Sequence, residues 1–188
     1  MTDTVLVTGG NGFLGSHACR TLAEAGYRVV AYDMATPRRF NLHIQARQAG
    51  EIEDAIGDIT DLSRLLWVCR QQNVCGIVHT AGSVDVESSV ERPSQTYQVN
   101  TFGSIVVYEA VRLLGLRRVV LISSNAVYGD VVADPMDEQH PVFSVKTGNA
   151  AAHYGASKLA AELIGLTYAR HNAVDLVALR TSAVYGFG

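Results

Sequence analysis

A tyrosine and a lysine at helical spacing are the first residues in this sequence that could do chemistry together. Tyr154 and Lys158 begin and end the segment YGASK, and residues four apart share one face of a helix. A free phenol has a pKa of about 10 and is a poor base near neutrality. A nearby ammonium and a positively charged ring would stabilise the phenolate. The pair therefore favours a site in which Tyr154 takes a proton from a substrate hydroxyl.

Three glycines early in the chain have the spacing of a phosphate-binding turn. They stand at positions 9, 12 and 15, between the apolar run 5–7 and a segment with helical periodicity. Glycine permits a tight turn and a close backbone approach to a diphosphate, which then lies at the positive end of the helix dipole. We expect a dinucleotide to bind here, at Gly9, Gly12, Phe13, Leu14 and Gly15.

An acidic residue at the end of the next strand-like run indicates which dinucleotide fits. Asp33 follows Arg28–Tyr32, where a carboxylate can accept hydrogen bonds from the adenosine ribose and repel a 2′-phosphate. NAD is therefore predicted as the cofactor, rather than NADP. In the alternative interpretation, Arg38 or Arg39 holds the 2′-phosphate instead.

A second acid follows the third strand-like run. Asp58 and Ile59 come just after Ile52–Ile56, where the adenine ring should lie. We expect both to contact the cofactor. Asp58 is equally explained as a turn or helix-capping residue, and the sequence leaves that alternative open.

These candidates are positioned by strands that alternate with helices. Such an order predicts a parallel sheet covered on both faces, and right-handed crossovers then place ligands at the carboxyl ends of the strands. We expect an α/β fold with a doubly wound parallel sheet, forming one domain over residues 1–188. The expected strands are Val5–Val7, Arg28–Tyr32, Ile52–Ile56, Cys75–His79, Arg118–Ile122 and Val174–Leu179, and the expected helices cover Phe13–Ala25, about 61–73, 93–115 and about 153–171.

Together the motifs resemble the extended short-chain dehydrogenase/reductases, in particular the NAD-dependent epimerase/dehydratase family. The resemblance covers the whole chain and implies an NAD(P)-binding Rossmann fold with NAD as the cofactor. The segments that carry it are Thr8–Gly15, Asp33, Asp58, His79–Gly82, Val99–Asn100, Ser123–Gly129, Tyr154–Lys158 and Leu179–Gly186.

The resemblance also implies cofactor contacts that the spacing alone does not indicate. Thr80, Ala81 and Gly82 follow the fourth predicted strand and would contact the cofactor in this family. Tyr154 and Lys158 would contact it as well as the substrate.

Two further catalytic assignments rest on the same resemblance. Ser124 matches the family residue whose hydroxyl holds the reacting oxygen beside Tyr154, although a serine after a strand is often a turn residue and Ser123 is its immediate neighbour. Asn100 matches the asparagine that supports Lys158 through a water molecule. Its alternative interpretation is a solvated asparagine on a helix.

Two positions argue against one branch of the family. Its sugar-nucleotide 4,6-dehydratases carry a Glu, often preceded by an Asp, just before the VYG motif, whereas this chain has Asn125 and Ala126 there. Neither side chain can act as a general acid or base, so the expected chemistry is reversible oxidation of a secondary alcohol. The preferred hypothesis is a sugar-nucleotide epimerase similar to the UDP-glucose 4-epimerases, with a nucleotide-sugar or sugar substrate. The alternatives are a net dehydrogenase or reductase of a sugar or related alcohol, and a non-catalytic NAD-binding protein.

Charge and composition restrict the partners. The net charge of −3 and the scattered basic residues give no field that would recruit nucleic acid or an anionic membrane. No apolar run is long enough to span a bilayer, and the start of the chain lacks a signal-peptide pattern, so we expect a cytoplasmic protein. Cys19, Cys69 and Cys75 stand at no metal-ligand spacing, and we expect buried free thiols and no bound metal.

Two helices should carry more apolar surface than a sheet can cover. The segment 94–114 is apolar over much of its circumference. Enzymes that it resembles pair this helix and the helix at 153–171 across a two-fold axis. We therefore expect a homodimer through these two helices, which a charge at Val107 or Val111 would disrupt.

The resemblance also implies a second domain. In family members the segment similar to Leu179–Gly186 leads into a smaller substrate-binding domain, which we expect beyond residue 188. The cofactor residues named above lie within residues 1–188, so these residues should bind NAD. They should turn over substrate poorly, because closing the site against water needs the second domain.

Overall fold

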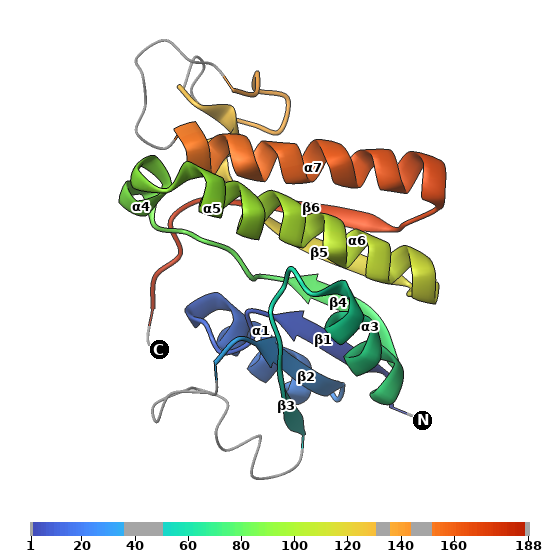
Figure 1. The fold of residues 1–188 in the computed structure, drawn as a ribbon. Helices are drawn as coiled ribbons and strands as arrows, with labels where there is room; N and C mark the ends of the chain where they lie inside the picture. Colours follow the sequence, from blue (N-terminus) through green and yellow to red (C-terminus); the bar gives the residue numbers. More distant parts are fainter. Residues whose placement is uncertain (1, 36–50, 131–135, 144–151, 187–188) are drawn as a thin grey trace.

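A computed structural model describes residues 2–35, 51–130, 136–143 and 152–186 of the chain. Its centre is a six-stranded sheet in which all neighbouring strands are parallel. The chain starts in the middle of the sheet, builds to one edge, and returns to place β4 beside β1, giving the order β3-β2-β1-β4-β5-β6 (Figure 1). The expected doubly wound parallel sheet is thus confirmed. The strands are β1 (Thr4–Thr8), β2 (Arg28–Asp33), β3 (Ile52–Ile56), β4 (Val74–His79), β5 (Arg118–Ser124) and β6 (Leu176–Thr181).

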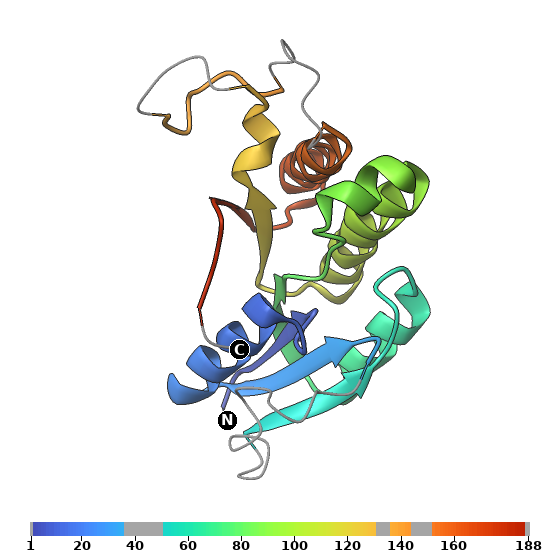
Figure 2. The same ribbon diagram turned by 90° about the vertical axis from the view of Figure 1, so that its left-hand side faces the viewer.

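Helices cover the two faces of the sheet unequally (Figure 2). α1 (Phe13–Glu24) lies on one face, whereas α3 (Leu62–Gln71), α6 (Gly103–Leu114) and α7 (Ala152–Asn172) lie on the other. The larger hydrophobic core is therefore on the side with three helices. Its fully buried members include Leu6, Leu65, Ile77, Val107, Tyr108 and Val119.

Helix ends follow the polar caps and glycine stops of the sequence. The Asp61 carboxylate accepts a hydrogen bond of 2.9 Å from the Arg64 N–H and so caps α3. Gly26 and Gly115, just past α1 and α6, have φ values of 88° and 61°, which a side chain would strain. These predicted boundaries are confirmed.

The segment between β4 and β5 is more broken than predicted. In place of a loop and one helix over 93–115, the chain forms α4 (Val86–Glu91), α5 (Pro93–Tyr97), a π-helical turn η1 (Gln98–Phe102) and then α6. In Figure 1, α5 and α6 follow one another along nearly one line. The prediction of a single regular helix was therefore wrong at the π turn, and α4 was missed.

The last strand starts two residues later than predicted. β6 is Leu176–Thr181 rather than Val174–Leu179, because the apolar Val174 belongs to the core that precedes the strand. Arg180 lies within β6, where its guanidinium forms an ion pair with Glu162 of α7 at 2.8 Å. Val177 and Leu179 are 37% and 45% exposed. The expected covering of both sheet faces therefore does not extend to β6 in the described residues.

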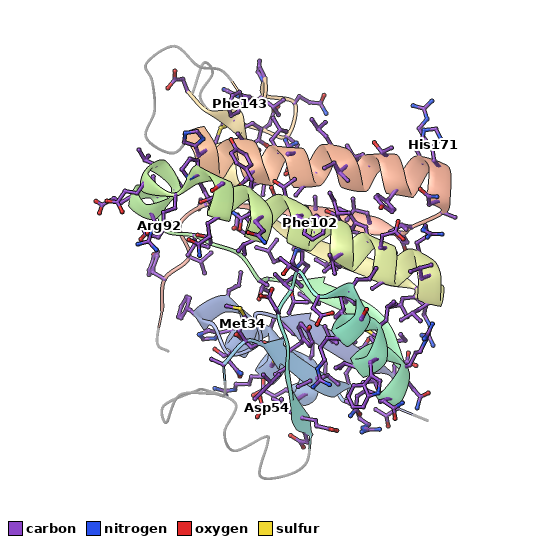
Figure 3. All side chains as sticks on the ribbon, in the orientation of Figure 1. Met34, Asp54, Arg92, Phe102, Phe143 and His171 are labelled. Atoms are coloured by element: carbon purple, nitrogen blue, oxygen red, sulfur yellow. The ribbon has the colours of Figure 1, made fainter. Side chains whose placement is uncertain are left out.

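α6 buries two of the residues that we expected at a dimer contact. Val107 and Val111 are 0% and 1% exposed and belong to the core under the helix. A charge at either position would disrupt the fold itself, so the proposed use of these positions to probe a dimer was wrong. The exposed large apolar side chains of η1, α6 and α7 are Phe102, Leu113, Leu163 and Leu166 (Phe102 is labelled in Figure 3).

Candidate active site

A cleft of about 990 Å³ lies at the carboxyl ends of the strands. The predicted cofactor residues come from separate elements but meet around it, together with the predicted catalytic Ser124. These lining residues are Gly9, Gly12, Phe13, Leu14, Gly15, Asp33, Asp58, Ile59, Thr80, Ala81, Gly82, Ser124, Tyr154 and Lys158.

The glycine turn after β1 brings backbone amides to one end of the cleft. The Gly9 N–H donates to the Tyr32 carbonyl at 2.8 Å, and Gly9 has a φ of 66°, which favours glycine. A Cβ on Gly15 would overlap the Gly9 carbonyl oxygen. Gly12 supplies no side-chain cap to α1, so the first-turn amides stay available to a diphosphate.

Asp33 lies at the end of β2 and fastens the glycine turn. Its Oδ2 accepts a hydrogen bond of 3.0 Å from the Asn11 N–H, and the residue lines the cleft. The carboxylate therefore fixes the loop and faces the space where a ribose would lie. Arg38 and Arg39 lie outside the described residues, so the alternative phosphate site stays a prediction.

Asp58 satisfies the turn interpretation and still lines the cleft. Its Oδ1 accepts hydrogen bonds of 2.8 Å from both the N–H and the hydroxyl of Thr60. Its carbonyl accepts a 2.8 Å hydrogen bond from the Tyr32 hydroxyl. Ile59, 6% exposed, lies beside it. Adenine contact by Asp58 and Ile59 remains a prediction.

The segment after β4 forms the middle of the cleft. The Thr80 hydroxyl donates to the Thr8 carbonyl at 2.6 Å, and the Ala81 N–H donates to the Thr8 hydroxyl at 3.2 Å. A Cβ on Gly82 would lie 3.2 Å from Lys158 Nζ and 3.1 Å from Asn100 Oδ1. Glycine here leaves the space beside the ammonium open to a ligand.

Tyr154 and Ser124 meet at the other end of the cleft. Ser124 is 8% exposed, and its hydroxyl lies close enough to the Tyr154 phenol to lower the pKa of that phenol. Ser124 Oγ also accepts a 3.1 Å hydrogen bond from the Ala126 N–H, which begins a 3₁₀ turn, η2 (Asn125–Tyr128). Ser124 is thus both a turn residue and a neighbour of the phenol. Ser123, by contrast, is buried without a hydrogen-bond partner for its hydroxyl among the described residues.

Lys158 is almost fully buried, one turn along α7 from Tyr154. The residue is 4% exposed, and its ammonium donates a 3.0 Å hydrogen bond to the Ile122 carbonyl of β5. Burial lowers the pKa of Lys158 to about 8, because the charged form loses hydration.

The pKa of Tyr154 does not follow our expectation from the sequence. Burial raises the pKa of the phenol above its usual value, and the hydrogen bond with Ser124 opposes that shift. The expected lowering by the Lys158 ammonium is not present in this structure. A phenolate would therefore depend on positive charge brought in by a ligand.

Asn100 lies in the π turn and is 1% exposed, so its interpretation as a solvated helix residue was wrong. Its Nδ2 donates to the Ser157 hydroxyl and to the Ser83 carbonyl, both at 3.0 Å. Its Oδ1 accepts from the Ser83 N–H at 2.7 Å. Asn100 thereby ties the segment after Gly82 to α7, one residue before Lys158.

Sequence reasoning missed the part of the cleft wall that comes from the broken helical segment and the chain after β6. Asp85 caps α4 through the Glu87 N–H, and this acid was the one available signal for α4. The missed lining residues there include Val84, Val86, Gln95, Gln98, Ser182, Ala183 and Val184, and Met34 after β2 was missed as well.

The described ranges hold neither a candidate metal cluster nor a membrane-spanning helix. No group of three or more His, Cys, Asp or Glu side chains in them could hold a metal ion. No disulfide joins any two of the three cysteines; Cys19 and Cys69 are buried and Cys75 is half-buried. None of the helices in these ranges is long and apolar enough to cross a membrane.

Comparison with known sequences finds one family over almost the whole chain. Residues 5–188 match the family model described as "NAD dependent epimerase/dehydratase family". The UDP-glucose 4-epimerase of Yersinia pestis is 36% identical over 162 residues, which are 85% of this chain and 46% of that protein. The Rhizobium leguminosarum bv. trifolii UDP-glucose 4-epimerase is 33% identical over 178 residues, 95% of this chain and 51% of that protein.

Solved structures give the same result. The crystal structure of UDP-glucose 4-epimerase from Brucella ovis in complex with NAD has a TM-score of 0.83 and 32% identity, covering 95% of this chain and 51% of that one. The enzyme from Bifidobacterium longum in complex with NAD⁺ and UDP has a TM-score of 0.82 and 28% identity, covering 94% of this chain and 52% of that one. The chain thus spans about half the length of the proteins that it matches.

Proposed function

Because this chain belongs to the NAD dependent epimerase/dehydratase family, we propose that it forms the NAD-binding part of a sugar-nucleotide epimerase. The observation that carries the proposal is the meeting of Tyr154, Ser124 and Lys158 in one cleft with the glycine turn. Relatives that are 33–36% identical and bear the name UDP-glucose 4-epimerase support the epimerase activity.

The cleft fits NAD at each of its parts. Gly12 leaves the first-turn amides of α1 free for the diphosphate, and a Cβ on Gly9 or Gly15 would displace the turn by colliding with the backbone of Ala81 or of Gly9. Asp33 would accept hydrogen bonds from the adenosine ribose. The space beside Gly82 would take the nicotinamide end, next to Lys158. When bound, NAD supplies a hydride acceptor that can later return the hydride to the same carbon.

Residues of this chain would take up and return the proton of the sugar hydroxyl. Tyr154 would take the proton of the sugar hydroxyl as general base while the carbon gives up its hydride, and would return the proton when the ketone is reduced. Ser124 would hold the reacting oxygen by its hydroxyl, which already contacts the phenol. Lys158, held by the Ile122 carbonyl at 3.0 Å, would direct its remaining protons to the cofactor ribose.

The wall of the cleft beside Ser124 supports epimerisation rather than dehydration. Asn125 and Ala126 line the cleft and carry no group that titrates. Elimination of water from a keto sugar needs a general acid and a general base. The chemistry proposed here therefore stops at the ketone, which is reduced again on its other face.

The activity test uses the full-length protein with UDP-glucose or UDP-galactose. We expect conversion to the 4-epimer without stoichiometric NADH release. Accumulation of one NADH per substrate consumed would instead indicate a dehydrogenase. In the Tyr154→Phe protein, we expect kcat to fall by about 10²–10⁴ with NAD affinity kept, since the general base is removed. Unchanged activity in this variant would remove the proposed mechanism.

Our proposal extends to a homodimer and to the cytoplasm. α6 and α7 lie side by side (Figure 1), and they expose Leu113, Leu163 and Leu166 at 47%, 55% and 60%. Helices that expose large apolar side chains together favour an isologous contact. The three cysteines are joined by no disulfide, which supports a reducing compartment.

A further inference from the structure

His79 is a buried titratable residue that the proposed chemistry does not use. It ends β4 opposite Thr8 of β1 and is 1% exposed. Its Nδ1 lies 2.7 Å from the Thr8 hydroxyl, and its Nε2 lies 3.1 Å from the Ser104 hydroxyl of α6. Both ring nitrogens are therefore engaged, Nδ1 by the neighbouring strand β1 and Nε2 by α6.

The neighbours of the ring determine which nitrogen carries the proton. The Thr8 hydroxyl already accepts from the Ala81 N–H at 3.2 Å, and within the described residues its own proton has His79 Nδ1 as acceptor. The Ser104 hydroxyl donates to the Asn100 carbonyl at 2.6 Å, so it accepts from Nε2. The hydrogen bonds thus run in one direction, from Thr8 through a ring protonated on Nε2 to Asn100.

The electrostatics agree with a neutral ring. Burial lowers the pKa of His79 to about 3, and the nearby Lys158 ammonium adds to that shift. At neutral pH the ring therefore carries a single proton, and the polarity of the chain of hydrogen bonds is fixed.

The two ends of this series of hydrogen bonds, Thr8 and Asn100, belong to different halves of the site. Thr8 holds Ala81 and, through its carbonyl, Thr80. Asn100 holds Ser157 of α7, which lies between Tyr154 and Lys158 in the sequence and donates to the Tyr154 carbonyl at 2.7 Å. The segment after β4 also contacts Asn100 directly, through two hydrogen bonds of Ser83 at 2.7 and 3.0 Å, whereas the segment after β1 reaches Asn100 through Thr8, His79 and Ser104.

We propose that His79 is a positioning residue whose neutral, Nε2-protonated ring couples the cofactor-binding segment after β1 to the Asn100–Ser157 contact, and so sets Tyr154 and Lys158 relative to the cofactor. The ring is buried and is not part of the cleft lining. This inference rests on the proposed function, since the alignment it describes is that of a hydride-transfer site.

Two amide substitutions each remove one of the two hydrogen bonds of the ring and keep the other. In His79→Asn, the amide oxygen takes the place of Nδ1 and keeps the acceptor for Thr8, but the donor to Ser104 is lost. In His79→Gln, the amide nitrogen reaches the place of Nε2 and keeps the donor to Ser104, but the acceptor for Thr8 is lost.

The full-length enzyme gives opposite expectations for these two variants. For His79→Asn we expect kcat to fall about tenfold with the Kd for NAD unchanged, because the Asn100 side of the site loosens. For His79→Gln we expect the Kd for NAD to rise about tenfold with a smaller change in kcat. Tenfold corresponds to about 1.4 kcal/mol, in the range of one buried hydrogen bond.

A purely structural role would give a different pattern. Val68→Ala, a change in the core under α3 where Val68 is 1% exposed, serves as the control that lowers Tm without touching this chain of bonds. If both His79 variants lower Tm as the control does and leave kcat and the NAD Kd within about twofold of wild type, the proposal is wrong.

The ring proton can be located directly. In ¹⁵N spectra of histidine-labelled protein at neutral pH, with His79→Gln used for assignment, we expect Nε2 to bear a proton and Nδ1 to be an acceptor. A ring protonated on Nδ1, or on both nitrogens, would overturn the proposal. If the wild type epimerises no nucleotide sugar, the proposed function fails. The NAD affinities and the spectrum still decide this inference in that case.

Discussion

At the scale of single residues, the cleft holds two polar groups whose charged forms are both disfavoured by burial. The pKa of the Tyr154 phenol is raised and the pKa of the Lys158 ammonium is lowered. Each unit of pKa corresponds to about 1.36 kcal/mol. A positively charged nicotinamide ring would favour the phenolate and so remove part of the cost at Tyr154. The cofactor would therefore activate the base, which would stay protonated without it.

The buried ammonium makes the stability of the cofactor-free protein depend on pH. Because burial lowers the pKa of Lys158 to about 8, the unfolded chain holds this proton more tightly than the folded protein. Between pH 8 and the ordinary lysine pKa, stability must then rise with pH. We expect wild type to gain about 2 kcal/mol over Lys158→Met between pH 8 and pH 10, measured by urea unfolding. A difference that is constant over this range would contradict the expectation.

The carboxylate at the end of β2 should determine the choice of dinucleotide. We expect the full-length protein to bind NAD(H) at least about tenfold more tightly than NADP(H), because Asp33 repels a 2′-phosphate. Asp33→Asn keeps an oxygen for the Asn11 N–H but removes the charge, so the preference should shrink about tenfold. Glu53→Gln, a change on the neighbouring β3 outside the cleft lining, is the control. Calorimetric titration measures both cofactors, and a wild-type preference for NADP(H) would instead indicate Arg38 or Arg39.

At the scale of elements, the site depends on how closely α7 approaches the turn after β5. A Cβ on Gly155 would overlap the Ala126 carbonyl oxygen, which is backbone and cannot move aside cheaply. Glycine at this point lets Tyr154, one residue earlier, reach Ser124.

A substitution at Gly155 distinguishes the effect of close packing from the effect of helix propensity. Propensity alone favours Ala over Gly in a helix by about 1 kcal/mol. We nevertheless expect Gly155→Ala to lower both Tm and kcat, the latter about tenfold, because the start of α7 must shift away from Ser124. Ala160→Gly, further along α7, should lower Tm and leave kcat near wild type. A Gly155→Ala protein that is more stable and fully active would show that the close approach is unimportant.

The sequence predicts those elements whose signals are local. The glycine turn, the Asp61 cap and the stop at Gly115 depend on residues next to one another in the chain, and the structure has these features as predicted. The π turn and the start of β6 depend on distant partners. Asn100 is buried because Ser83 and Ser157 satisfy its amide, and such pairings cannot be seen in one-dimensional spacing.

The same distinction holds for the candidate site. The positions of Tyr154, Lys158 and the glycines around one cleft follow from motif spacing and the order of strands. The raised pKa of Tyr154 and the buried ring of His79 do not, because both come from packing between elements far apart in sequence. Burial is a property of the folded chain.

At the scale of the whole molecule, the exposed side of α6 and α7 should decide the oligomeric state. Leu163 and Leu166 are 55% and 60% exposed on α7, so charges there leave the core intact. We expect the wild type to be a dimer by light scattering at tens of micromolar and Leu163→Glu/Leu166→Glu to be a folded monomer. Trp67→Glu, at an equally exposed position of α3 (54%), should remain a dimer. A double variant with the mass of the wild type would contradict this interface.

The π turn also keeps a row of buried polar side chains on one side of the continuous helical segment formed by α5, η1 and α6. Thr96, Asn100, Ser104 and Tyr108 are each no more than 2% exposed, although they recur every four residues. In a regular α-helix, every four-residue step rotates a side chain by about 40°, so such a line would turn away from the sheet. The wider turn at Gln98–Phe102 takes up one extra residue and cancels that drift. A regular α-helix of the same length would thus place Thr96 and Tyr108, twelve residues apart, about 120° from one another around the helix.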